Sequence, residues 1–284
     1  MLHDRALLVT LSLSKFEPKR TDKRITRQVL SDHGAAAGTL RVAKKLLPDE
    51  AIEPINKLHS ETREYHYRHT LAWGEQGERL LNSQFFMEYA AAMAAFREKA
   101  DALSDTFAAH YDDYVATART SLNGAFDPSD YPAQRLIREK FRFKLEYSPV
   151  PAAGDFRISV MEEAMENLRQ SVDIRIADAT RSARTEAARR LAEPLAAMVQ
   201  RLSDPDAVFR DSLVTNLREM ADLLPVLNVT ADPELDSVRQ RILTDLYQAD
   251  PGLLRENRTV RASTARKAQS ILDTMNGFFA PAAS

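Results

Sequence analysis

The sequence contains no cysteine, and only 8 of its 284 residues are glycine. The absence of cysteine excludes disulfides, cysteine-ligated zinc, iron–sulfur clusters and thiol catalysis, and it is typical of cytoplasmic proteins. We therefore expect a cytoplasmic location. Scarce glycine disfavours glycine-rich sandwiches and barrels and favours long helices.

Long hydrophobic runs are missing as well. No apolar segment approaches the roughly 20 residues that a membrane-spanning helix requires, so we expect no membrane association. The first residues, MLHDRALLVTLSLSKF, lack the basic lead-in and the small-residue cleavage site of a signal peptide. We expect them to form a strand instead, because their apolar residues alternate.

Signatures of nucleotide binding and of hydrolase chemistry are also absent. The sequence has no GxxxxGK[ST], GxGxxG or GxSxG segment. The adjacent carboxylates Asp112-Asp113 and Glu162-Glu163 lie on predicted helices, where neighbouring residues point to different faces, so they are not expected to work as acid and base. The sequence therefore predicts a protein that is not an enzyme and carries no cofactor.

Charge is distributed unevenly along the chain. Residues 15–45, here called the basic arm, hold nine Lys and Arg against three acids, a balance of +6, while the other residues hold 30 basic and 38 acidic side chains, a balance of −8. Cations at this density could neutralise several phosphates of a nucleic acid, but they could equally pair with the acidic remainder. The candidate binding residues of the arm are Lys19, Arg20, Lys23, Arg24, Arg27, Lys44 and Lys45.

Two stretches alternate with the period of a strand. Apolar residues at positions 7, 9, 11 and 13 predict an N-terminal strand, and alternation over 141–147 and 156–160 predicts a β-hairpin at about 140–160 that the N-terminal strand extends. Phe143 and its apolar neighbours then share one face, with Arg142, Lys144 and Arg157 on the other. This small basic face is a candidate contact for an acidic partner or a phosphate backbone, although such faces more often serve solubility.

Two longer stretches repeat with the period of a helix. Apolar residues recur about every 3.7 residues over 85–122, a helix of about 37 residues and about 55 Å, and again over 161–202. The simplest burial of both stripes is an antiparallel pair. The sequence thus predicts a mainly α fold: a long, coiled-coil-like antiparallel helix pair with a small antiparallel β-sheet at one end and extra C-terminal helices.

Shorter helices are predicted from Pro48 to about Thr70, after Asp204-Pro205-Asp206, and from Asp232-Pro233-Glu234 to about Tyr247. Residues 1–247 are expected to form a single elongated domain. Residues 248–284 are expected to form a basic, partly flexible tail.

Three histidines, His59, His66 and His69, fall on one face of the predicted helix at 48–70. The face could hold a metal, contact phosphate together with Arg63 and Arg68, or simply edge the core. A metal is disfavoured because the two arginines would repel a cation and no carboxylate stands at HExxH spacing. We therefore expect no metal, and we keep Arg63, His66, Arg68 and His69 as candidate phosphate contacts.

Trp73 is the only tryptophan, and Tyr65, Tyr67 and Arg79 flank it. An exposed aromatic ring beside arginine can stack on a nucleic-acid base. A lone tryptophan in a loop more often fills the edge of a core. Trp73 is kept as a candidate contact with both interpretations open.

Four segments of the chain resemble a known family: LLVTLSLSKFEPKRTDKRITRQVLSDHGA, HYRHTLAWGEQGERLL, FRFKLEYSPVPAAGDFRISV and RLSDPDAVFRDSLVTNLREMADLLPVLN. Over about residues 5–230 the chain resembles a family of bacterial, phage and plasmid proteins known as a domain of unknown function; SPVP…GDFR and DPDAVFRDSLV are the more specific parts. The resemblance implies an origin on mobile elements, near genes for a cobaltochelatase-like AAA ATPase and a von Willebrand A-domain protein. It implies no catalytic residues.

These features predict a non-enzymatic interaction or scaffold protein in a phage- or plasmid-encoded assembly. The resemblance suggests an AAA ATPase or a von Willebrand A-domain protein as its partner, and homo-oligomerisation is left open. The alternative is a nucleic-acid-binding protein of replication, recombination or genome protection that uses the basic arm. A metal-dependent enzyme is a third, weaker hypothesis.

Overall fold

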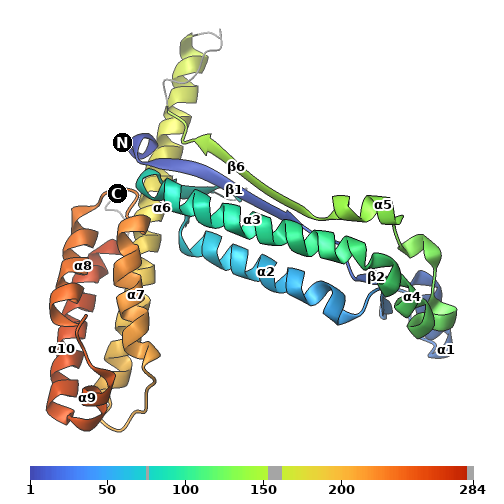
Figure 1. Ribbon diagram of the computed structural model, residues 1–284. Coiled ribbons are helices and arrows are strands. Elements are labelled where there is room, and N and C mark those ends of the chain that lie inside the picture. Colours follow the sequence, from blue (N-terminus) through green and yellow to red (C-terminus); the bar gives the residue numbers. More distant parts are fainter. Residues whose placement is uncertain (75–76, 153–161, 280–284) are drawn as a thin grey trace. The chain divides into compact units, whose positions relative to one another are not determined.

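The computed structural model describes residues 1–74, 77–152 and 162–279, with the side chains of 162–165 left out (Figure 1). The chain divides into two compact units. Unit 1 comprises Met1–Thr10, Tyr67–Met87 and Glu146–Ser284, and unit 2 comprises Leu11–His66 and Glu88–Leu145. Each unit has a hydrophobic core. The residues 1–247 expected to form one elongated domain contribute to both units, and the chain enters and leaves each unit more than once.

The fold is mostly helical and includes a four-stranded antiparallel sheet. Its strands, in spatial order, are β4 (Leu71–Ala72), β5 (Arg79–Asn82), β1 (Ala6–Ser14) and β6 (Arg142–Pro149). Leu8 of β1 stands opposite Leu80 of β5, and both are buried. The N-terminal strand and the first strand of the predicted hairpin are therefore confirmed as neighbours. The second predicted strand, at 156–160, lies outside the described residues.

Unit 1 is built around a long helix. Its helices are α6 (Glu162–Ser203), α7 (Ser212–Leu227), α8 (Pro233–Asp245), α9 (Pro251–Glu256) and α10 (Arg258–Thr274) (Figure 1). The predicted stripe of α6 is buried from Ala179 to Leu202, in one core with apolar side chains of α7, α8 and α10. α8 starts as predicted, because the Asp232 carboxylate accepts a hydrogen bond from the Glu234 backbone N–H at 2.8 Å.

The segment expected to be a basic tail is packed into unit 1. Ala265, Ala268 and Ile271 of α10 are buried against the core. Phe278, after the end of α10, is buried as well. The described residues that were expected to form a tail thus pack on the core, because α10 carries an apolar stripe among its charges.

The helix expected directly after Asp204-Pro205-Asp206 begins later, at Ser212. The preceding loop is held by Arg261, whose guanidinium donates to the carbonyl oxygens of Arg201 at 2.7 Å and Ala207 at 2.8 Å. Because a buried arginine satisfies these carbonyls, the loop does not need helical hydrogen bonds.

Unit 2 pairs α2 (Asp49–Arg68) with α3 (Phe86–Ala109), which lie side by side in Figure 1. Tyr65 near the end of α2 stacks on Tyr89 near the start of α3, so the two helices run antiparallel. The core at the other end contains Ile52 and Phe107. α2 confirms the helix predicted from Pro48 to about Thr70.

The predicted helix over 85–122 is broken at His110 into α3 and α4 (Tyr111–Leu122). Its apolar stripe continues across the break, since Phe107 and Tyr111 are both buried. The stripe is buried by residues of its own unit, as that of α6 is by α7, α8 and α10. A coiled-coil pair of the two long helices is thus not clearly shown, because each stripe has another partner. Among the described helices, none combines the length and the hydropathy needed to cross a membrane.

Candidate functional site

The basic arm folds around a short helix within unit 2. β2 (Lys19–Thr21) and β3 (Ala43–Lys45) form a two-stranded antiparallel ribbon that sets Lys19 opposite Lys45, and α1 (Lys23–Asp32) lies between them in sequence. The Asp22 carboxylate caps α1 by accepting hydrogen bonds at 2.9 Å from the backbone N–H groups of Arg24 and Ile25. Most of the cations counted in the sequence are thereby gathered on one small substructure.

Two of the predicted binding cations serve the fold instead. Lys44 is only 9% exposed, and its ammonium lies 2.6 Å from the Asp130 carboxylate and 3.2 Å from that of Asp22. It also donates to the Ala125 carbonyl at 3.0 Å. Arg20 contacts the same Asp130 at 3.0 Å. Lys44 is therefore unavailable to a partner, and Arg20 is tied to a buried carboxylate.

The electrostatics of this buried group agree with a structural role. Burial alone would lower the pKa of Lys44, but its hydrogen bonds to Asp130 and Asp22 outweigh burial and raise that pKa above its ordinary value. The pKa of Asp22 is lowered, chiefly by its hydrogen bond from the Ile25 backbone N–H. Desolvation acts in the opposite direction, and the hydrogen bond from Lys44 lowers the pKa further. Lys44 and Asp22 are thus charged at neutral pH, and the contacts of Lys44 with Asp130 and the Ala125 carbonyl attach the ribbon to residues 125–130.

Other cations of the arm remain exposed. Lys19, Lys23, Arg27 and Arg41 form no ion pair among the described residues. Arg24 donates to the Gly124 carbonyl at 2.9 Å, and Lys45 at the end of β3 pairs with Asp49 at the start of α2. The arm therefore offers fewer available cations than its sequence suggests. Arg41, which we did not select from the sequence, is one of them.

Two hollows flank α1, and Lys23 and Arg27 line both. One has a volume of about 640 Å³ and also contains Arg20, Arg24 and Asp130. The other, here called the α1 groove, has a volume of about 590 Å³. The α1 groove is lined by Thr21, Lys23, Thr26, Arg27, Leu30, Gly38, Leu40 and Arg41.

The three histidines do not converge. His59 is buried, and desolvation followed by the charges of Arg63 and Lys15 lowers its pKa to about 4. The Nδ1 atom of buried His66 lies 2.6 Å from the Tyr89 hydroxyl. The ring of His69 stacks on a phenylalanine, Phe85, with the ring centroids 5.2 Å apart. Within the described ranges, no cluster of three or more His, Cys, Asp or Glu side chains is placed to hold a metal.

The proposed phosphate face on this helix is also divided. Arg63 is exposed, while Arg68 pairs with Glu219 at 2.8 Å. Because His66 is buried, the four selected residues do not form one exposed basic face, and this prediction is wrong as a set. The sequence could not show this, since the spacing of the histidines is the same for a buried face and an exposed one.

Trp73 fills the edge of a core. It is 5% exposed, belongs to the core of unit 1 and lies under the Arg175 guanidinium, 5.4 Å from its carbon to the ring centroid. Its ring cannot stack on a base while the core is intact, so the core interpretation holds and the contact role does not.

The basic face of β6 is present in the described part. Arg142 and Lys144 are exposed, whereas Phe143 and Leu145 on the opposite face are half-buried. The Arg97 guanidinium covers the Phe143 ring, with its carbon 5.5 Å from the centroid. The predicted alternation of faces is confirmed over these residues, and Arg157 lies outside the described residues.

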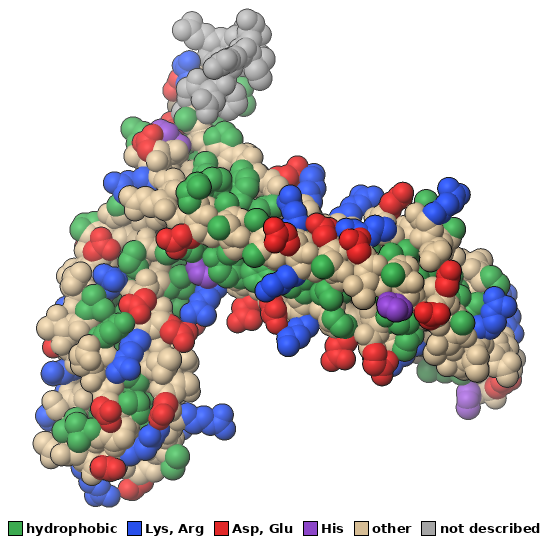
Figure 2. All heavy atoms as spheres, in the orientation of Figure 1, with side chains coloured by type: hydrophobic (Ala, Val, Ile, Leu, Met, Phe, Trp, Pro, Cys, Tyr) green, Lys and Arg blue, Asp and Glu red, His purple; other side chains and the backbone are tan. Residues whose placement is uncertain are grey.

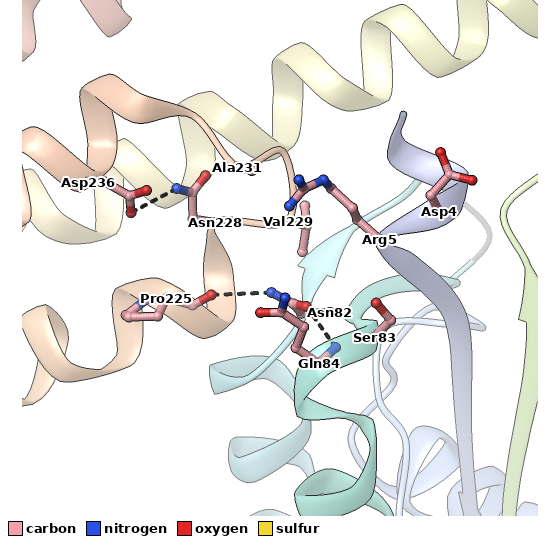
Figure 3. Close-up of a pocket in the computed structure, with 10 residues that line it drawn as sticks. All are labelled: Asp4, Arg5, Asn82, Ser83, Gln84, Pro225, Asn228, Val229, Ala231 and Asp236. Carbon is pink, nitrogen blue, oxygen red and sulfur yellow. Dashed lines mark hydrogen bonds between the residues drawn. The ribbon is translucent and has the colours of Figure 1, made fainter.

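Unit 1 contains a polar pocket that we did not predict from the sequence (Figure 3). Its volume is about 490 Å³, and Figure 3 shows the side chain of Arg5 extending toward the segment that carries Val229 and Ala231. Asn82 donates to the Pro225 carbonyl at 3.2 Å and caps the next turn. No motif indicated this pocket, because its residues come from three distant parts of the chain.

Charge of both signs covers the rest of the visible surface. On the face shown in Figure 2, basic and acidic side chains are interspersed over α7, α8 and α10, and acidic side chains follow the outer edge of α2. Several cations there are paired, as Arg184 is with Asp232 and Glu234. In the basic arm, by contrast, the cations Lys23, Arg27 and Arg41 line one hollow together.

Comparison of the chain with protein-family models, with curated proteins and with solved structures finds no match. A functional proposal therefore rests on the residues of the chain itself.

Proposed function

We propose that the chain is a non-enzymatic interaction protein that holds a partner at its basic arm, within an assembly encoded by a phage or plasmid. One observation carries the proposal: α1 is an amphipathic helix that buries none of its side chains. Helices of globular proteins normally bury an apolar stripe against the core. The apolar residues Ile25, Val29 and Leu30 are only half-buried, which is what a surface awaiting a partner would show.

The surroundings of α1 support a binding role. A ten-residue helix is marginal on its own in water, yet the Asp22 cap and the ribbon of β2 and β3 hold it in place. The exposed cations Lys23, Arg27 and Arg41 stand around it. An ordered helix with unpaired charge and an uncovered apolar face suits recognition of another macromolecule.

The partners to test first are those that the family resemblance suggests, an AAA ATPase and a von Willebrand A-domain protein encoded nearby. Each would be immobilised and exposed to the full chain, and binding measured by biolayer interferometry. The triple variant Lys23→Glu, Arg27→Glu, Arg41→Glu should weaken binding by about tenfold or more. A matched control reverses Arg135, Arg210 and Arg266, exposed cations of other elements for which the described residues supply no ion pair.

The control variant should bind as wild type does, because it has the same net charge as the arm variant. If a partner binds wild type and both variants with the same affinity, the basic arm is not its binding site. Failure of both proteins to bind would remove the partners that the resemblance suggests.

A second candidate function, nucleic-acid binding, is favoured by the density of exposed cations, namely Lys19, Lys23, Arg24, Arg27 and Arg41. Gel shifts with single- and double-stranded DNA and RNA at two salt concentrations test it. Affinity should fall steeply with salt. Reversing Lys19, Lys23 and Arg27 should abolish the shift; Arg20 is left unchanged because it pairs with the buried carboxylate of Asp130 and its reversal would disturb the fold. No shift at low salt would exclude this function.

A further inference from the structure

The α1 groove has two chemically distinct walls and belongs wholly to unit 2. One wall is a face of α1, where Lys23, Arg27 and Leu30 recur at helical spacing. The other wall is the segment 38–41, with Leu40 and Arg41. Its volume of about 590 Å³ is within the range of protein pockets that bind ligands.

A local hydrogen bond fixes the positions of the two walls relative to each other. The Thr26 hydroxyl donates to the Asp22 carbonyl at 2.6 Å and accepts from the Val42 backbone N–H at 3.0 Å, which joins α1 to the opposite segment. Gly38 has a φ of +90°, a left-handed conformation that favours glycine, and no atom lies within 4 Å of where a Cβ would stand. The groove therefore exists before any partner binds.

The rim of the groove is positive. Lys23, Arg27 and Arg41 form no ion pair among the described residues, while Asp22, the acid next in sequence to the groove, is occupied as helix cap and partner of Lys44. A ligand that fills the groove would bring its own negative charge to three cations. Charge complementarity therefore favours an acidic ligand.

The interior of the groove is apolar. Leu40 is 42% exposed, and Leu30 is half-buried beside it. Of the eight lining residues none is aromatic, so the groove offers no ring on which a nucleic-acid base could stack. Leucines inside a cationic rim suit a ligand that combines carboxylates with apolar side chains.

We infer that the α1 groove binds an acidic segment of a partner protein, with apolar side chains at helical spacing that contact Leu30 and Leu40 and carboxylates that pair with Lys23, Arg27 and Arg41. This inference rests on the proposed interaction function and names the chemistry of the partner. The binding mode is that of an amphipathic helix in a groove, in which a few apolar anchors supply affinity and the charges supply orientation.

The test uses the full chain and three labelled probes of equal negative charge, read by fluorescence anisotropy. The first probe is a helical Glu/Leu peptide with leucine at positions i, i+3, i+4 and i+7, the second replaces each leucine by serine, and the third is single-stranded DNA. The Glu/Leu peptide should bind at least about tenfold more tightly than either of the others, because only it can fill the apolar part.

Two variants separate the two parts of the groove. Leu40→Ser should lower the affinity for the Glu/Leu peptide by about fivefold or more and leave the affinity for the serine peptide unchanged. Because Leu40 is exposed, it contributes little to folding. The triple arm variant Lys23→Glu, Arg27→Glu, Arg41→Glu should lower the affinity for both peptides. The control variant described above should bind both peptides as wild type does. Circular dichroism confirms that each variant is folded.

Any of three results would overturn the inference. They are equal affinity for the two peptides, an affinity for DNA as high as that for the Glu/Leu peptide, and an unchanged affinity of the Leu40→Ser variant for the Glu/Leu peptide. Concentration-dependent dimerisation lost in the Leu40→Ser variant would assign the groove to a second copy and would also overturn it. If the full-length partners bind through the arm while the peptide test fails, only this inference falls. If the peptide test succeeds and neither partner binds, the groove stands and the proposed partners fall.

Discussion

Protonation of His59 should weaken the fold of unit 2 as the pH falls below neutral. The imidazole is 6% exposed on α2, in a part of the helix that Arg63 and Lys15 keep positive. Desolvation is the largest cause that lowers its pKa, and the two cations add to it, so the value is about 4 where an unperturbed histidine has 6.5. At neutral pH the buried ring is therefore uncharged.

The sign of the effect follows from which state binds the proton. Below pH 6.5 the unfolded chain takes up a proton at His59, whereas the folded chain does so only near pH 4. The stability that the neutral ring provides is complete above pH 6.5 and is lost as the pH falls to about 4. At about 1.4 kcal/mol per pH unit, the loss in the free energy of unfolding is about 3 kcal/mol.

The measurement compares wild type with His59→Leu by urea unfolding, followed by far-UV circular dichroism between pH 7 and pH 4. Carboxylates titrate in both proteins, so the difference between their free energies of unfolding isolates His59. That difference should shift by about 3 kcal/mol in favour of the variant as the pH falls. The same substitution at exposed His33 is the control, because an exposed ring loses no solvation on folding.

A difference that stays constant within about 0.5 kcal/mol across this range would show that folding does not hold His59 neutral. A titration of the His59 ring by NMR with a midpoint near 6.5 would refute the reasoning directly.

Three further perturbations test the packing. Lys44→Ala should lower stability by about 2 kcal/mol, because two carboxylates lose their buried counter-charge; unchanged urea unfolding would contradict this. Phe141→Ala should cost about 3 kcal/mol, and the half-buried Phe143→Ala about half as much, by thermal unfolding; equal losses would contradict the different burial of the two rings. Arg261→Lys keeps the charge but loses the fork that bonds several carbonyls, so amides of the loop before α7 should exchange hydrogen faster while those of α3 do not; unaltered loop exchange would refute its role.

Elements that depend on local chemistry could be predicted from the sequence. α2 follows from acidic residues at its start and a helical apolar stripe, and α8 from an Asp-Pro-Glu start whose Asp232 caps the helix. β1 and the described part of the hairpin follow from alternation, which their exposures keep over 11–14 and 142–145, although Leu8 and Val9 of β1 are both buried. In each case the residues that decide the structure lie within about one or two turns of one another, so a single window contains the whole cause.

Pairing between distant elements could not be predicted in this way. The stripe of α6 is a repeat of apolar residues at steps near 3.7, which any apolar helix face can cover, and α7 and α10 cover it. The late start of α7 at Ser212 depends on Arg261, about fifty residues further along, whose guanidinium satisfies carbonyls at the end of α6 and in the loop. Neither cause can be seen in the segment that it acts on.

The basic arm shows the same division at the level of function. Its balance of +6 is correct as a count, but a count treats Lys44 and Lys23 alike. Lys44 is neutralised by Asp22, which is near in sequence, and by Asp130, which is distant, whereas Lys23 has no partner among the described residues. A ligand could gain affinity only from exposed, unpaired cations such as Lys23, because the charge of a buried, paired cation such as Lys44 is already neutralised within the fold.

The surviving cations are also better placed than a count implies. Lys23 and Arg27 stand one helical turn apart on α1, so both can reach one ligand lying along the helix, and Arg41 reaches it from the opposite wall. Leu30 and Leu40 lie among them, which a charge balance cannot register. Three convergent cations around two leucines are more selective than nine cations spread along a chain, since a ligand must match both the charge and the apolar spacing to gain from them.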